Sequence, residues 1–172
     1  MTADQSLGAF LAKYDPAIEK TGREVLAAIR KLLPGAIELV YDNYNALAVG
    51  FASSERASDV VLSIVLYPRW VSLFFLRGSS LVDPDRRLNG SGSRVRHVVL
   101  ESGGATLREP AVQDLIRQAI ARADPPLPQS GKRKLVIKSV SARQRPRRPA
   151  PKDSLRGTAA RSRLTRRTGA GR

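Results

Sequence analysis

The sequence contains no cysteine and only one histidine, His97. Disulfide bonds and thiolate nucleophiles are therefore excluded, and a zinc site would lack the further nitrogen or sulfur ligands that it needs. No Gly-x-Ser-x-Gly segment and no Gly-Lys-Ser/Thr phosphate loop is present, so the motifs that mark a serine nucleophile or a nucleotide phosphate site are also missing. We expect a protein that is not an enzyme.

Long uninterrupted hydrophobic runs are also missing. The longest apolar run, Val60–Leu76, is broken by Pro68 and Arg69, and each half is rich in β-branched and aromatic residues. This texture predicts two strands joined by a tight turn, not a membrane span. Both faces of the first half are apolar, which predicts a central strand with layers packed on either side. With Asp4 and no apolar secretory signal near its start, the chain is expected to be cytoplasmic.

Acidic residues are almost absent from the C-terminal quarter of the chain. Residues 131–172 hold 15 lysines and arginines and one acid, Asp153, whereas residues 1–130 hold 15 basic and 14 acidic residues. The formal net charge of +15 therefore belongs almost entirely to the C-terminal part. Dense arginine, several prolines and few apolar residues predict disorder. We place a folded domain at 1–125 and a disordered Arg/Pro-rich tail at 126–172, where only Leu135–Ile137 could dock on a sheet edge.

Hydrophobic periodicity and turn residues outline the folded domain. Helical spacing predicts a short entry helix at 6–13, a long helix from Asp15-Pro16 to the Pro34-Gly35 stop, and a closing helix at 112–120. Alternation predicts strands within 37–51, in the two halves of 60–76 and at 94–101. Because the connections are short, neighbouring strands should be antiparallel. The predicted fold class is α+β: a mainly antiparallel four- to five-stranded sheet with N-terminal helices and a C-terminal helix packed on it.

Two groups of residues are candidates for binding a small ligand. Aromatic side chains gather at the turn end of the central strand pair, and a glycine-rich loop is followed by arginines that could hold an anion. The candidates are Tyr67, Trp70, Phe74, Gly90, Gly92, Arg94, Arg96 and His97. Core packing, a hairpin loop and an edge-strand histidine are the structural alternatives for these residues.

Carboxylates in the long helix and the strand after it are candidates for a metal site. Asp15 and Glu19 begin the helix, and Glu38 and Asp42 lie on the strand. Oxygen ligands of this kind could hold a hard cation such as iron if they converged. A solvated helix face is the alternative interpretation.

The C-terminal lysines and arginines are candidates for binding nucleic acid or another polyanion. Arginine matches phosphate oxygens well, and residues 131–172 contain no aromatic residue to stack on bases, so sequence-independent binding is expected. The candidate residues are Lys132, Arg133, Lys134, Lys138, Arg143, Arg145, Arg147, Arg148, Arg161, Arg163, Arg166 and Arg167. A dispensable extension with no ligand is the alternative.

Several segments together resemble a known family. The segments Leu66–Phe75, Gly90-Ser91-Gly92 and Arg94–His97, with Pro34-Gly35-Ala36 and Tyr44-Asn45-Ala46, are similar to the YdhG-like domain family, from about Leu7 to Ala123. The resemblance implies a small α+β domain and, for one branch, a frataxin-like role in iron delivery. The acidic surface that such a role needs is not matched by the nearly neutral residues 1–130, and the arginine-rich tail lies outside the family pattern.

Three functions are therefore open from the sequence. The leading hypothesis is a binding module, not an enzyme, whose basic tail associates with nucleic acid or another polyanion. The alternatives are an iron-binding chaperone and a small-molecule binder or enzyme that uses an aromatic and basic pocket. No cofactor is firmly indicated, and iron enters only through the resemblance.

Overall fold

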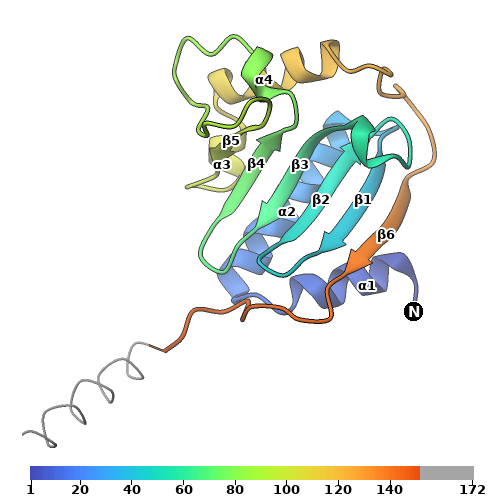
Figure 1. The fold of residues 1–172 in the computed structure, drawn as a ribbon, viewed down its shortest axis with the longest axis vertical. Helices are drawn as coiled ribbons and strands as arrows, with labels where there is room; N and C mark the ends of the chain where they lie inside the picture. Colours follow the sequence, from blue (N-terminus) through green and yellow to red (C-terminus); the bar gives the residue numbers. More distant parts are fainter. Residues whose placement is uncertain (152–172) are drawn as a thin grey trace, which may run out of the picture.

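The computed structural model describes residues 1–151, which form an α+β fold around one six-stranded sheet (Figure 1). The strands lie in the order β5-β4-β3-β2-β1-β6. Their bounds are β1 Ile37–Asp42, β2 Leu47–Ala52, β3 Val60–Leu66, β4 Val71–Phe75, β5 Arg96–Val99 and β6 Lys134–Val140. The helices are α1 Ala3–Leu11, α2 Pro16–Leu32, α3 Gly104–Leu107 and α4 Pro110–Ala121, with short 3-10 turns η1 Ala57–Asp59 and η2 Gly78–Ser80.

The predicted central strand pair is confirmed. β3 and β4 are antiparallel neighbours, and the backbone N–H of Tyr67 donates to the carbonyl of Trp70 at 2.9 Å to close the turn between them. Pro68 suits this turn because its ring fixes φ and it has no N–H to satisfy. Ile64 in β3 is fully buried. The predicted number of strands is wrong, since the sheet has six strands.

Three of the α-helices, α1, α2 and α4, form near their predicted places, whereas the short α3 was not predicted, and α2 packs closely on the sheet. Pro16 occupies the first turn of α2, where a missing N–H costs nothing, and Asp15 is its N-cap residue. At Gly22 a Cβ atom would lie 2.6 Å from a methyl of Leu66, so glycine lets the helix approach β3 closely. None of the helices within residues 1–151 is long and apolar enough to cross a membrane.

One face of the sheet carries the helices and the large core. Figure 1 shows α1 and α2 behind the sheet, and no α-helix within the described residues crosses its front. Leu62, Ile64 and Leu73 are buried on the helix side, whereas Phe74 is only half-buried on the front. The prediction of packed layers on both faces is therefore wrong. The apolar pattern of the sequence did not distinguish a face covered by helices from a partly open one. Val65, for example, is buried on the front although no α-helix within the described residues lies above it.

The C-terminal segment is part of the fold. β6 pairs with β1 in parallel, from Ile37 opposite Lys134 to Asp42 opposite Val140. This docking confirms the exception expected at Leu135–Ile137. The prediction of disorder from residue 126 is wrong for residues 134–140, and the chain stays hydrogen-bonded beyond them, with the N–H of Arg145 donating to the carbonyl of Tyr44 at 2.9 Å.

Candidate functional site

Two carboxylates on β1 point toward the helices and attach the C-terminal segment to the sheet. Glu38 is 1% exposed and receives hydrogen bonds from Arg30 of α2, at 2.9 and 2.8 Å, and from Arg133, at 2.6 and 3.2 Å. Burial alone would raise the pKa of the Glu38 carboxyl, but the hydrogen bonds from Arg30 and Arg133 outweigh it and lower that pKa. Glu38 therefore holds the start of β6 as an ionised anchor.

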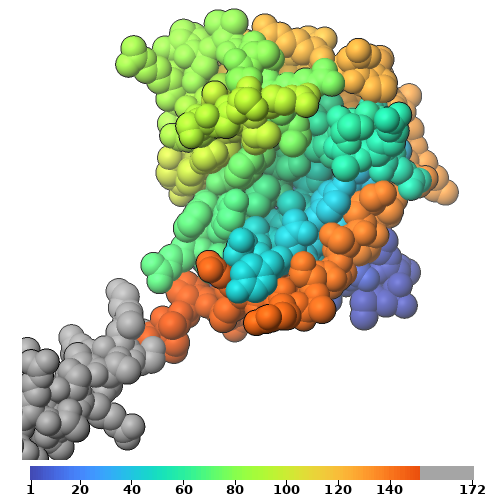
Figure 2. Space-filling model, viewed as in Figure 1, coloured from blue at the N-terminus to red at the C-terminus, as the bar shows by residue number. Residues whose placement is uncertain are grey.

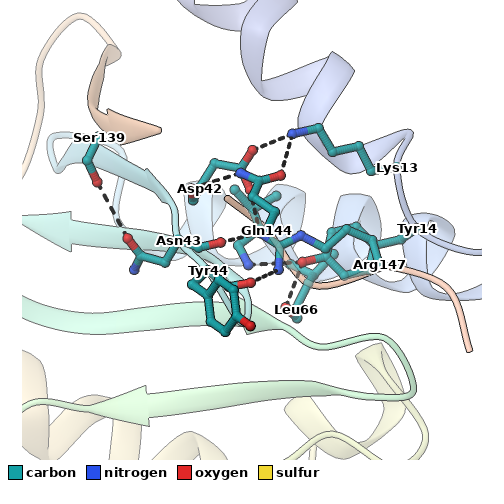
Figure 3. Close-up of polar contacts among 10 residues, drawn as sticks. Lys13, Tyr14, Asp42, Asn43, Tyr44, Leu66, Ser139, Gln144 and Arg147 are labelled. Carbon is teal, nitrogen blue, oxygen red and sulfur yellow. Dashed lines mark hydrogen bonds and ion pairs between the residues drawn. The ribbon is translucent and has the colours of Figure 1, made fainter. Parts of the chain in front are cut away.

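Asp42 plays the same part at the other end of β1 (Figure 3). Its carboxylate accepts a hydrogen bond from Lys13 at 2.6 Å and one from Arg147 at 2.8 Å. The side chains of Asp42 and Arg147 are 1% and 3% exposed, so this is a buried ion pair. Burial would raise the pKa of the Asp42 carboxyl, but the hydrogen bonds, that from Lys13 first among them, hold it below its usual value.

The Arg147 guanidinium also binds the turn between β1 and β2. It donates to the carbonyl of Tyr44 at 3.3 Å and to that of Asn43, and it lies 5.8 Å from the centre of the Tyr14 ring. The Tyr14 hydroxyl, whose pKa burial raises to about 12, donates to the Leu66 carbonyl and accepts from the Leu47 N–H. Arg147 is therefore a structural residue that fixes residues 141–149 beneath the sheet.

The four carboxylates proposed as metal ligands do not converge. Each has its own cationic partner: Asp15 with Arg148, Glu19 with Arg23, and the two β1 carboxylates with the cations described above. Within residues 1–151 no group of three or more His, Asp or Glu side chains could hold a metal ion. The iron hypothesis required these four carboxylates to converge, and that prediction is wrong. Each carboxylate instead forms ion pairs within the fold.

A groove opens where the C-terminal segment passes the turn between β3 and β4. We call it the basic-aromatic groove. It encloses about 560 Å³ and is lined by Tyr67, Arg69, Trp70, Arg145 and Arg148, with Asn45 and the prolines Pro68, Pro146 and Pro149. Figure 2 shows the tip of the β3–β4 turn beside the C-terminal segment at the lower edge of the sheet. The groove is thus built from segments far apart in the sequence.

The aromatic wall of the groove is a stacked pair held by the turn. The rings of Tyr67 and Trp70 lie 4.9 Å apart with 26° between their planes, and Trp70 remains 45% exposed. Next to the groove, the Arg145 guanidinium lies 5.5 Å from the centre of the Tyr44 ring, and Tyr44 is also 45% exposed. The hydrogen bond that closes the turn keeps the Tyr67–Trp70 stack in place, so one flat aromatic surface stands preformed at the groove.

The groove carries charge of one sign. Its lining includes three arginines and no carboxylate among the described residues. Arg69 and Arg145 form no ion pair within residues 1–151, and Arg148 has only Asp15, at 3.8 Å. An arginine guanidinium without a carboxylate partner presents several free N–H donors in one plane. Chemically, the groove suits a ligand that combines negative charge with a flat ring.

The structure divides the residues predicted to bind a small ligand. Tyr67 and Trp70 line the groove at the β3–β4 turn, whereas Arg96 lies opposite Phe75 at the other end of β4. Gly90, Gly92 and Arg94 lie in the exposed loop before β5, where Arg96 donates to the carbonyls of Gly92 and Val95. Phe74 and His97 stack on each other at 4.9 Å on the front of the sheet. These residues therefore do not form one pocket.

The predicted polyanion-binding residues also divide into two sets. Within the described part of the chain, four of them form ion pairs with acids: Arg133, Lys134, Arg147 and Arg148. The other four, Lys132, Lys138, Arg143 and Arg145, form no ion pair within residues 1–151, although Lys138 lies near Glu55 and donates to its carbonyl at 3.1 Å. The remaining candidates, Arg161, Arg163, Arg166 and Arg167, lie outside the described residues. Half of the described set is therefore partly or wholly occupied by the fold itself.

Arg69 in the groove and Tyr44 beside it were not among the predicted binding residues. Arg69 appeared only in the predicted turn of the central strand pair, and Tyr44 only in a segment that carries the family resemblance. The available signal was the Tyr67-Pro68-Arg69-Trp70 sequence, in which a cation lies between two aromatic residues at a hairpin tip. The contact of Tyr44 with Arg145, 101 residues later, had no sequence signal at all.

No protein-family model, curated protein or solved structure matches this chain. The resemblance to the YdhG-like family therefore stays a prediction.

Proposed function

We propose that this protein binds nucleic acid through the basic-aromatic groove and the unpaired cations beside it. The observation that carries the proposal is the lining of the groove, in which three arginines and a stacked Tyr67–Trp70 pair meet without any described carboxylate. Guanidinium groups bind phosphate oxygens in a bidentate manner, and aromatic rings stack on bases. Nucleic acid is the common biological polymer that offers both groups in a repeating pattern.

The charge around the groove supports the same ligand. Arg143 and Arg145 are exposed, and neither they nor Arg69 are neutralised within residues 1–151. Residues 131–172 add a net charge of +14, which would steer a polyanion toward the groove from a distance. Binding should therefore release counterions, and its affinity should fall steeply as salt is added.

The test measures binding of a labelled duplex DNA to the full chain at several salt concentrations. If six phosphates are neutralised, log K should fall against log salt with a slope of about −5. Truncation at residue 130 would not test the effect of charge alone, because it also removes β6 and the buried Arg147. Point substitutions of surface arginines change the charge without removing these structural elements.

The matched variants remove equal charge at two places. Arg69→Gln with Arg145→Gln removes two groove arginines, and Arg56→Gln with Arg108→Gln removes two exposed arginines elsewhere that also form no ion pair within residues 1–151. The groove pair should make the salt slope less negative by about 2 and weaken binding, while the control pair should change little. Equal effects of the two pairs, or no binding by the wild-type chain at low salt, would contradict the proposal.

A further inference from the structure

The exposed ring of Trp70 is placed for stacking on a ligand. Tyr67 covers one side of the Trp70 indole, and the hairpin turn holds both rings in position before any ligand arrives. A rigid aromatic ring loses little freedom when another flat ring packs on it, because it has already been ordered by the fold. Stacking of a base on such a ring is favourable and does not depend strongly on which base it is.

Cations surround this ring from two segments of the chain. Arg69 lies in the same turn as Trp70, while Arg145 and Arg148 approach from the C-terminal segment. In a nucleotide chain, each base is linked through its sugar to phosphates on both sides. A base stacked on Trp70 would therefore bring its neighbouring phosphates to the arginines that line the same groove.

Only an unpaired base can use both features together. In a duplex the faces of each base are covered by its neighbours, and exposing one requires that base to be unstacked and unpaired. A duplex would therefore contact the groove arginines through phosphates and leave Trp70 unused. Resting on the nucleic-acid function proposed above, we infer that the groove takes single-stranded nucleic acid, with a base stacked on Trp70 and the flanking phosphates on Arg69, Arg145 and Arg148.

The fluorescence of Trp70 reports on this contact directly, because it is the only tryptophan in the chain. We would titrate the full chain at low salt with a twelve-nucleotide oligothymidylate, a duplex of equal length and an abasic oligomer with the same phosphates. Oligothymidylate should quench Trp70 and bind about tenfold more tightly than the abasic oligomer. The duplex should bind like the abasic oligomer and leave the fluorescence unchanged.

Two further probes show whether the ligand is a strand or a single nucleotide, and whether it is DNA or RNA. Thymidine monophosphate carries the same base and a phosphate without a strand, and oligouridylate carries a ribose backbone. Weak binding of the monophosphate supports a strand as the ligand, and affinity for the monophosphate equal to that for the oligomer would overturn it. Similar affinities for oligothymidylate and oligouridylate support recognition by stacking and phosphates alone, since neither group depends on the 2′-hydroxyl. Strong preference for oligouridylate would overturn that account of recognition.

Substitution of Trp70 separates stacking from charge. Binding of labelled oligomers is followed by anisotropy, since the variants have no tryptophan. Trp70→Ala should weaken oligothymidylate binding about tenfold and leave binding of the abasic oligomer unchanged, whereas Trp70→Phe should retain most of the affinity. Equal losses for both oligomers, or tighter binding of the duplex with no quenching by oligothymidylate, would overturn the single-strand inference alone. Absence of binding to every probe would instead overturn the nucleic-acid function itself.

Discussion

Arg147 and Arg145 lie two residues apart in the C-terminal segment and have opposite environments. The Arg147 side chain is 3% exposed and is paired with Asp42, whereas Arg145 is exposed, forms no ion pair within residues 1–151 and lies over the ring of Tyr44. One arginine holds the segment to the sheet, and the other is free to meet a ligand. The difference teaches that net charge counts cations without saying which ones are available, so the +14 of residues 131–172 overstates the charge offered to a partner.

The largest effect should come from removing the partner of Arg147. Asp42→Ala would leave a buried guanidinium without its carboxylate, and the free energy of unfolding should fall by about 3–5 kcal/mol. Denaturant unfolding followed by circular dichroism measures this loss. The double variant Asp42→Ala with Arg147→Met should recover part of the stability, because no unpaired buried charge remains. A loss below about 1 kcal/mol, typical of exposed ion pairs, would show that Arg147 is no anchor.

Acid should weaken the same anchors to a smaller extent. The pKa values of Glu38 and Asp42 are lowered in the folded state, so their stabilising contribution is complete above about pH 4, the ordinary value for unfolded carboxyls. It should be lost as the pH falls below that value through the lower folded-state pKa values. Urea unfolding at pH 6, 5, 4 and 3 tests this, and Glu38→Gln should flatten the dependence. A loss of stability confined to the range between pH 6 and 5 would point to other groups.

The smallest effect on stability should come from Arg145. Arg145→Gln removes an exposed guanidinium that has no acidic partner within residues 1–151, so the free energy of unfolding should change by less than about 0.5 kcal/mol. The same variant should weaken binding of DNA, measured by anisotropy at low salt. Its matched control is Arg108→Gln, an exposed arginine that also forms no ion pair within residues 1–151. A destabilisation as large as that of Asp42→Ala would remove the distinction between anchoring and free arginines.

Local sequence signals predicted most of the helices and strands. Asp15-Pro16 and Pro34-Gly35 frame α2, the Tyr67–Trp70 turn joins β3 to β4, and helical spacing places α4. These features depend on residues close together in the chain, where capping, turn geometry and periodicity act directly. The open front of the sheet was not predictable in this way. In the sequence, the half-buried Phe74 looks the same as an apolar residue of the core.

The candidate site was predictable only in its parts. Tyr67 and Trp70 were identified from their place at a hairpin tip, and Arg145 and Arg148 from the basic tail. Their meeting depends on the parallel pairing of β6 with β1, which joins residues nearly one hundred positions apart. Composition favoured disorder for that segment, and the ion pairs of Glu38 with Arg133 and Asp42 with Arg147 overrode it. Such long-range pairs leave no pattern in a single sequence.

The parallel docking of β6 replaces β1 as the edge of the sheet with a strand that carries Lys134 and Lys138, and lysines on an edge strand disfavour pairing with other chains. β1 would otherwise be an edge strand, with a row of unpaired backbone N–H and C=O groups that another strand could extend. Because β6 is the last strand of the described region, the β1 edge stays open until nearly all of residues 1–151 have been synthesised, and closing it joins residues almost one hundred positions apart. Sequence changes that loosen the C-terminal segment therefore expose a site for aggregation, even when the ligand-facing arginines are untouched.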